Sequence, residues 1–233
     1  MTVTTKVKPS LPQRKIVDRN RRAIFARPHP LQSLDSLAVL THCRRGQEIC
    51  SPARPADTWY LVIAGTARRY VVRTDGRRQI LDLLFPGDFF GFSARDEYDF
   101  VVESVSEGTL VAAYPRRRVE LLADSDPRLA REIRQVTFEA LSRLQSQLVM
   151  LGRITALEKV SSFLLDMAAR SSEGSAGIVI LPISRYDIAD YLALSVETVS
   201  RSLTDLKHRG IIKLSGTRCV MITDRKALEL CIE

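Results

Sequence analysis

The hydrophobic pattern of this chain changes from strand-like to helical near Tyr114, and that change limits the folds it can adopt. Between Gly46 and Tyr114, short apolar or alternating runs are separated by turn residues. Asp75-Gly76 lies between two alternating runs, which is typical of a tight hairpin that needs positive φ. Many short strands at this spacing predict a small antiparallel barrel or jelly roll. Beyond Tyr114 the apolar residues recur at helical spacing, so we expect an α+β fold.

A long helix is predicted after the strands. Asp126-Pro127 indicates its start, with Asp as the cap and Pro in the first turn, and Gly152 indicates its end. At ~1.5 Å per residue this helix would be ~37 Å long. Its main apolar stripe recurs every three or four positions and comprises Leu129, Ile133, Val136, Ala140, Leu144, Leu148 and Leu151.

The stripe on this helix has two interpretations. A long striped helix between two domains predicts the seam of a homodimer, and we assign the seven residues to that seam. A core helix that packs on its own chain is the alternative. Phe138, Leu141 and Val149 lie off the stripe, so a second face is also partly apolar. Such a helix can pack on its own strands and on a partner.

The segment from Ser184 to Gly210 predicts a helix-turn-helix. Ser184 caps a first helix, Ala193-Leu194 makes a turn, and Ser195 caps a second helix. The buried stripe of the second helix is predicted to be Val196, Val199, Leu203 and Leu206.

The opposite face of the second helix is polar. Glu197, Ser200 and Arg201 lie in its first two turns, where such a helix enters the DNA major groove. Arginine can bind guanine O6 and N7 bidentately, glutamate can accept from cytosine N4, and serine can contact more than one base. We therefore expect these three side chains to read bases. An ordinary amphipathic surface helix is the alternative.

The residues after Gly210 favour the DNA-binding interpretation. Two short apolar runs flank Ser215-Gly216-Thr217-Arg218, which predicts the β-hairpin wing of a winged helix. The stretch from Ser195 to Arg218 carries five basic and two acidic residues, as expected where phosphates are met. The predicted DNA-backbone contacts are Arg185, Ser195, Thr198, Lys207, Thr217 and Arg218.

Composition sets the remaining limits. The net charge of +8 comes mainly from residues 1–27, which hold eight basic residues and one acidic residue. This tail is predicted to be a solvated, flexible segment, with a DNA-touching arm as the alternative. No run approaches the ~18 apolar residues of a membrane helix, and the N-terminus lacks a secretory core. We expect a soluble, cytoplasmic protein.

The four cysteines form no tight pair of the kind that holds zinc or an iron–sulfur cluster, so no metal site is predicted. Cys43 and Cys50 bracket a strand-like segment and could respond to oxidants, although buried, inert thiols are the favoured interpretation. The sequence shows no nucleophile–base grouping, so we expect no enzyme.

Several motifs together resemble the CRP/FNR superfamily of bacterial regulators, over about residues 31–228. The motifs are Gly46-Gln47-Glu48-Ile49, Pro55-Ala56-Asp57, Tyr60-Leu61-Val62-Ile63-Ala64-Gly65, Gln79-Ile80, Pro86-Gly87-Asp88, Asp187-Ile188-Ala189-Asp190-Tyr191-Leu192 and Glu197-Thr198-Val199-Ser200-Arg201. The resemblance implies a cyclic-nucleotide-binding-like antiparallel β-barrel (a double-stranded β-helix) over 28–126. It also implies a dimerisation helix over 127–152 and a winged helix-turn-helix over 153–233.

The recognition helix resembles the FNR–FixK branch, because Glu-x-x-Ser-Arg falls on Glu197, Ser200 and Arg201. That branch implies a homodimeric activator that works with RNA polymerase. It also implies palindromes of TTGAT-like half-sites in promoters of oxygen- or nitrogen-responsive genes. Ala193 and Ser195 stand where relatives often carry Gly and Thr.

The effector pocket departs from the cyclic-AMP-binding members. Phe92, Tyr98 and Asp99 stand near the places of their acidic residue and their arginine–serine phosphate clamp. We therefore expect neither cyclic-nucleotide binding nor a cofactor. The alternative is a protein gated by an unidentified ligand, haem or redox signal, for which His42 and Cys43 would be available.

Overall fold

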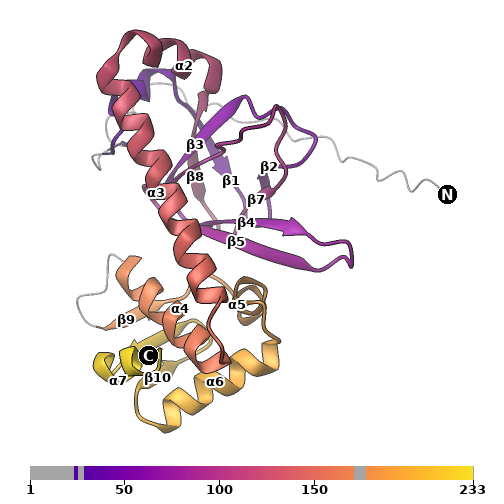
Figure 1. Cartoon of the computed structure of the whole chain (residues 1–233), viewed down its shortest axis with the longest axis vertical. Coiled ribbons are helices and arrows are strands. Elements are labelled where there is room, and N and C mark those ends of the chain that lie inside the picture. Colours follow the sequence, from indigo (N-terminus) through magenta and orange to yellow (C-terminus); the bar gives the residue numbers. More distant parts are fainter. Residues whose placement is uncertain (1–23, 26–28, 171–176, 233) are drawn as a thin grey trace, which may run out of the picture.

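The computed structural model describes residues 24–25, 29–170 and 177–232. The predicted basic tail, apart from Ile24 and Phe25, lies outside the described residues. Figure 1 shows a lobe of strands above a smaller, mainly helical lobe, with one long helix running from the first to the second.

The strand lobe consists of a 3-10 helix followed by eight strands. These are η1 (Gln32–Leu37), β1 (Val39–Cys43), β2 (Glu48–Cys50), β3 (Thr58–Ala64), β4 (Ala67–Val72), β5 (Arg78–Leu84), β6 (Phe89–Phe90), β7 (Val101–Ser104) and β8 (Thr109–Pro115). They form two antiparallel four-stranded sheets, in the orders β1-β8-β3-β6 and β2-β7-β4-β5. Buried residues from both sheets share one cluster, so the sheets pack face to face. The predicted strand domain is confirmed as two packed sheets rather than as one closed barrel.

The hairpin predicted at Asp75-Gly76 joins β4 to β5. Gly76 has a φ of +81°, which glycine adopts without a steric penalty. The Arg73 amide donates to the Arg77 carbonyl at 2.8 Å, and the Asp75 carboxylate accepts from the Arg77 amide at 3.0 Å. A register shift between Arg69 and Tyr70 marks a bulge in β4. The hairpin lies along the side of the strand lobe that faces the helical lobe (Figure 1).

The long helix forms where the sequence predicts it. After α2 (Arg116–Ser125), α3 runs over Pro127–Leu151. The Asp126 carboxylate accepts from the amides of Arg128 and Leu129, which satisfies two free donors of the first turn. None of the helices in the described ranges is long and apolar enough to cross a bilayer.

The helical lobe completes the chain. Its elements are α4 (Ala156–Arg170), β9 (Ile178–Ile180), α5 (Arg185–Leu192), α6 (Val196–His208), β10 (Ile212–Ser215), β11 (Cys219–Ile222) and α7 (Arg225–Leu230). The three strands form a sheet in the order β10-β11-β9. The largest hydrophobic cluster joins Tyr70, Ile80 and Leu83 of the β4–β5 hairpin to Phe163 and Tyr191 of this lobe. The two lobes therefore share one core.

Candidate nucleic-acid interface

A reciprocal hydrogen-bond pair fixes the start of α5. The Ser184 hydroxyl accepts from the Asp187 amide at 3.2 Å, and the Asp187 carboxylate accepts from the Ser184 amide at 3.0 Å. This is a capping box, which satisfies donors at both ends of the first turn. Ser184 is the predicted cap, whereas the role of Asp187 in the box was not predicted, although Ser-x-x-Asp is a recognisable signal.

The turn between the two helices has a left-handed residue. Ala193 has φ 52° and ψ 47°, and the Leu194 amide donates to the Ala189 carbonyl at 3.0 Å. Ala189 of α5 is buried in the shared core. Ser195 then caps α6 by accepting from the Thr198 amide at 3.1 Å. The predicted helix-turn-helix, with its two caps, is confirmed.

The conformation of Ala193 gives a stability prediction. Ala193→Gly is expected to raise the free energy of unfolding by ~0.5–1 kcal/mol, because left-handed backbone strains alanine more than glycine loses in chain entropy. Denaturant unfolding with an unchanged m-value would measure this. The control is Ala189→Gly within α5, which is expected to lower stability by ~1 kcal/mol or more. A lower stability for Ala193→Gly would contradict strain at the turn.

The two faces of α6 separate as predicted. Val199, Leu203 and Leu206 are buried in the shared core. Glu197 and Arg201 are exposed, and Ser200 is half-buried beside them. Hydrogen bonds hold the pKa of the Glu197 carboxyl below its usual value, with the larger effect from the Glu197 backbone amide and a smaller one from the Ser195 hydroxyl. The positive charge of Arg201 also lowers this pKa. Glu197 is therefore an anionic acceptor at the exposed start of the helix.

The structure brings together two predicted site residues that lie on different helices. Arg185, at the first position of α5, donates from Nη1 to the Ser200 hydroxyl of α6 at 3.2 Å. Arg185 was predicted as a phosphate contact and Ser200 as a base reader. This contact leaves the Ser200 hydroxyl oriented by Arg185 before any DNA is bound.

A double-mutant cycle tests the Arg185–Ser200 contact. Arg185→Gln and Ser200→Ala are each expected to weaken DNA binding. The double variant should lose less binding free energy than the sum of the two single losses, with a coupling energy of ~1 kcal/mol. Arg185→Gln should also relax discrimination at the base pair that Ser200 contacts. Affinities on duplexes varied at each position would show this. If the two losses in binding free energy were additive, and if Arg185→Gln weakened binding equally on all duplexes, Arg185 would be only a phosphate contact.

The wing forms beside this helix pair. β10 and β11 pair from Ile212 with Ile222 to Ser215 with Cys219, and Gly216 at the tip has a φ of +75°. Thr217 and Arg218 at the tip are exposed, as is Lys207 near the end of α6. The predicted hairpin is therefore confirmed, and its polar residues are accessible.

The predicted dimer stripe of α3 is largely buried within this single chain. Leu129, Val136 and Ala140 of the predicted dimer seam are buried in this chain, where Leu129 and Val136 pack in one core with Trp59 and Leu110. Ile133 packs against the same core, and Leu144 and Leu151 are half-buried. The first part of the stripe therefore packs on the chain's own strands, as in the alternative interpretation, and the dimer seam along the rest of α3 stays a prediction.

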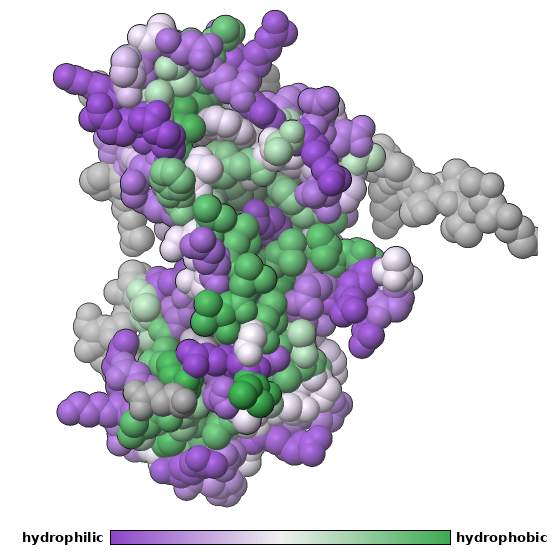
Figure 2. All heavy atoms as spheres, viewed as in Figure 1, coloured by the Kyte–Doolittle hydropathy of each residue, from purple (hydrophilic) through white to green (hydrophobic). Residues whose placement is uncertain are grey.

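A second apolar face of α3 is left uncovered in the single chain. The exposed side-chain fractions are 62% for Phe138, 48% for Leu141, 68% for Leu148 and 62% for Val149. Of these four residues, only Leu148 belongs to the predicted stripe. Figure 2 shows hydrophobic residues along the middle of the molecule, on the side where α3 runs.

Side chains from both sheets pack against one another in the interior of the strand lobe. Tyr98 is buried and donates from its hydroxyl to the Thr58 carbonyl. The rings of Tyr60 and Phe90 stack with centroids 5.0 Å apart. Aromatic groups thus occupy the interior near the place where the resemblance puts a nucleotide phosphate clamp.

Cys43 and Cys50 lie in the same interior. Burial raises the pKa of Cys43 to about 11 and that of Cys50 to about 12, so both thiols stay protonated near neutral pH. Because the thiolate is the reactive form, this burial disfavours the redox interpretation and favours inert core thiols. His42 is exposed, whereas its neighbour Cys43 is buried, so the two do not share a pocket.

Comparisons with known proteins agree with this architecture. Residues 158–231 match the Crp-like helix-turn-helix domain, and residues 40–126 match the cyclic nucleotide-binding domain. The chain is 42% identical to the nitrogen fixation regulation protein FixK of Azorhizobium caulinodans over 202 residues, 85% of this chain and 81% of that protein. It is 37% identical to FixK of Rhizobium meliloti over 187 residues, 80% of this chain and 84% of that protein.

A solved structure is similar throughout. The structure of FixK2 from Bradyrhizobium japonicum superposes with a TM-score of 0.78 at 36% identity, covering 84% of this chain and 98% of that one. A winged helix-turn-helix with an exposed polar recognition face therefore lies in a chain whose relatives are transcription regulators. The protein belongs to the CRP/FNR family of transcription regulators.

Proposed function

We propose that this protein is a homodimeric transcription activator that reads palindromes of TTGAT-like half-sites and needs no small-molecule ligand. One observation carries the proposal: Glu197, Ser200 and Arg201 lie together on the accessible side of the first two turns of α6. Relatives named as a nitrogen fixation regulation protein and as a transcriptional activator support promoter activation. The promoters would be those of oxygen- or nitrogen-responsive genes. RNA polymerase would then be the second partner.

Each base reader has a matching chemistry. Arg201 would bind guanine O6 and N7, and the ionised Glu197 would accept from the amine of cytosine N4. Ser200, oriented by Arg185, would contact a neighbouring base. The phosphates would be met by residues around this helix and on the wing: Arg185, Ser195, Thr198, Lys207, Thr217 and Arg218.

The exposed face of α3 supports a homodimer. Phe138, Leu141, Leu148 and Val149 form an apolar face on the exposed side of a helix whose buried side packs on its own chain. Two copies related by a two-fold axis would cover this face isologously and present two recognition helices. Such a dimer matches a palindromic site, because protein symmetry and half-site symmetry correspond.

The packed interior of the strand lobe supports binding without a ligand. Tyr98, Phe90 and the buried cysteines occupy the space between the sheets. A cyclic nucleotide would have to displace this packing and would find Asp99 near its phosphate.

Mobility-shift titration with the purified full chain tests the proposal. A TTGAT…ATCAA duplex should shift with no additive, and a scrambled duplex of equal composition should bind far more weakly at the same salt concentration. Equal binding to both duplexes would contradict sequence reading. Strict dependence on a cyclic nucleotide, haem or an oxidant would contradict ligand-free binding and favour the gated alternative.

A further inference from the structure

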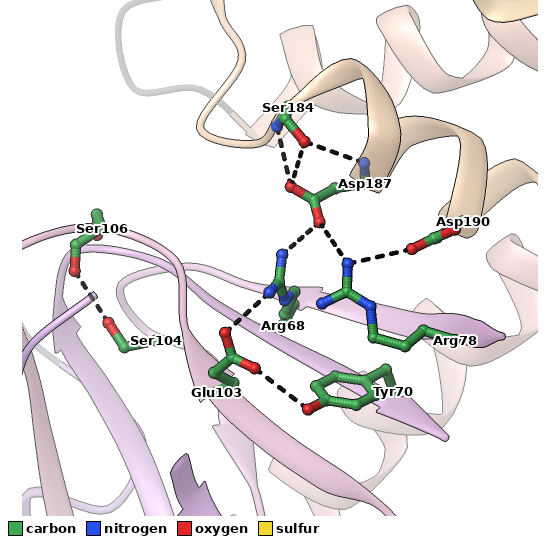
Figure 3. A network of polar contacts seen from close by, with 9 residues as sticks. All are labelled: Arg68, Tyr70, Arg78, Glu103, Ser104, Ser106, Ser184, Asp187 and Asp190. Carbon is green, nitrogen blue, oxygen red and sulfur yellow. Dashed lines mark hydrogen bonds and ion pairs between the residues drawn. The ribbon is translucent and has the colours of Figure 1, made fainter. Parts of the chain in front are cut away.

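The first helix of the helix-turn-helix rests on the β4–β5 hairpin of the strand lobe. Arg68 of β4 donates from Nη1 to Asp187 of α5. Arg78 of β5 reaches Asp190 of α5 with 3.4 Å between Nη2 and Oδ2, and Gln79 donates to the Asp190 carbonyl at 2.8 Å. Figure 3 shows the two arginines pointing from the hairpin toward the two carboxylates of α5.

The Arg68–Asp187 pair is shielded from solvent. Only 13% of the Arg68 side chain and 8% of the Asp187 side chain are exposed. Arg68 also donates from Nη2 to Glu103 of β7 at 2.8 Å, and Glu103 accepts from the Tyr70 hydroxyl at 3.2 Å. A guanidinium held by carboxylates from both lobes has little freedom, and charge-assisted hydrogen bonds of this kind are the strong ones.

Asp187 connects this docking to the geometry of the helix-turn-helix. Its Oδ2 accepts from the Ser184 amide and hydroxyl in the capping box, and its Oδ1 accepts from Arg68. The same carboxylate therefore caps the first turn of α5 and bonds α5 to the β4–β5 hairpin. Since α5 packs on α6, the position of α5 sets the position of the recognition helix.

A second group of contacts lies at the Pro86-Gly87-Asp88 turn. Asp88 pairs with Arg170 of α4 at 2.6 Å and with Arg143 of α3 at 3.3 Å. The Gln147 side chain of α3 donates to the Tyr191 carbonyl of α5 at 2.7 Å. These contacts support the same placement of the helical lobe, and they leave Glu197 and Arg201 exposed.

We propose that Arg68 and Arg78 are positioning residues for DNA reading: by docking α5, they fix where each recognition helix lies and thereby the spacing between half-sites that the dimer accepts. This inference rests on the proposed palindrome-reading dimer. In a dimer, half-site spacing follows from the distance between the two recognition helices. A loosened α5 lets each helix-turn-helix shift, so the dimer tolerates other spacings while each α6 reads the same bases.

Binding of the full chain to a series of duplexes tests this inference. The series keeps both half-sites and adds or removes one base pair between them. The spacing preference is the ratio of the affinity for the best spacing to the affinity for the others. Arg68→Met is expected to reduce this ratio by about tenfold, since a hydrogen bond to a charged group is lost. Arg68→Lys, which keeps the charge, should restore part of the preference. Base discrimination within the half-site should not change.

Arg78 gives an independent version of the test. Its side chain is one-third exposed, so Arg78→Glu should leave the fold intact and relax the spacing preference. Adding Asp190→Arg to this variant should restore the preference by exchanging the charges. The matched control is Arg77→Met in the same hairpin, because the Arg77 side chain is 76% exposed and pairs with Asp75 at the turn. Arg77→Met should keep the preference of the unmodified protein.

The possible failures are distinguishable. If the unmodified protein binds scrambled DNA as well as the palindrome, the proposed function fails. If it reads the palindrome and the Arg68→Met and Arg78→Glu variants keep its full spacing preference, whatever their overall affinity, the positioning inference is overturned.

Discussion

Arg201→Ala is expected to weaken binding to the TTGAT…ATCAA duplex by ~1–3 kcal/mol per half-site and to abolish the preference for one guanine. Arg201 is exposed in the second turn of α6, where the bidentate donor pattern of a guanidinium fits guanine O6 and N7. The loss should therefore be specific to one base pair. Titrations against duplexes that carry each of the four bases at that position would measure it.

Lys207→Ala provides the matched control for Arg201→Ala. Lys207 is also exposed on α6, but it lies in the last turn, away from the predicted base-reading residues. Its removal should weaken binding about equally on all sequences and reduce the salt slope by ~1 per half-site. If Arg201→Ala instead weakened all sequences equally, Arg201 would be a phosphate contact and the base-reading assignment would be wrong.

Leu148→Asp is expected to separate the dimer and to lower affinity for the palindrome by ~100-fold or more, because two linked half-site contacts become two separate ones. Leu148 is 68% exposed in the single chain, so the new carboxylate does not disturb the chain's own core. In the dimer it would be placed between two apolar faces and would lose its hydration. Sedimentation analysis, together with DNA titration, would measure both effects.

Leu121→Asp is the control for this experiment. Leu121 is 63% exposed on α2, so the substitution is chemically identical but lies off the proposed α3 seam. The Leu121→Asp variant should remain dimeric and bind DNA normally. A dimer that persists in the Leu148→Asp variant would place the interface elsewhere on the molecule.

Some features of this protein follow from local sequence. The hairpin at Gly76, the cap at Asp126, the caps at Ser184 and Ser195 and the polar face of α6 were all predictable. Each depends on residues a few positions apart, whose backbone preferences and short-range hydrogen bonds act within one turn or one helix. The polar face that we propose to read bases could be predicted for the same reason, because helical spacing alone separates buried from exposed positions on α6.

Other features depend on contacts between distant segments. The stripe on α3 was visible in the sequence, but periodicity does not say whether an apolar face packs on its own chain or on a partner. Only the packed strands decided that Leu129 and Val136 face inward while Phe138 and Leu148 face outward. The interior around Cys43 and Cys50 is likewise a property of two assembled sheets, and it gives these thiols their raised pKa values.

The strand domain, the long helix and a capped helix with Glu197, Ser200 and Arg201 on its polar face follow from the sequence, because hydrophobic period and capping act locally. The tertiary structure alone decided which face of α3 remains free, that Arg185 orients Ser200, and that Arg68 holds Asp187. The last two contacts join residues 15 and 119 positions apart. No local preference encodes such pairs, since they form only when the shared core brings the two lobes together.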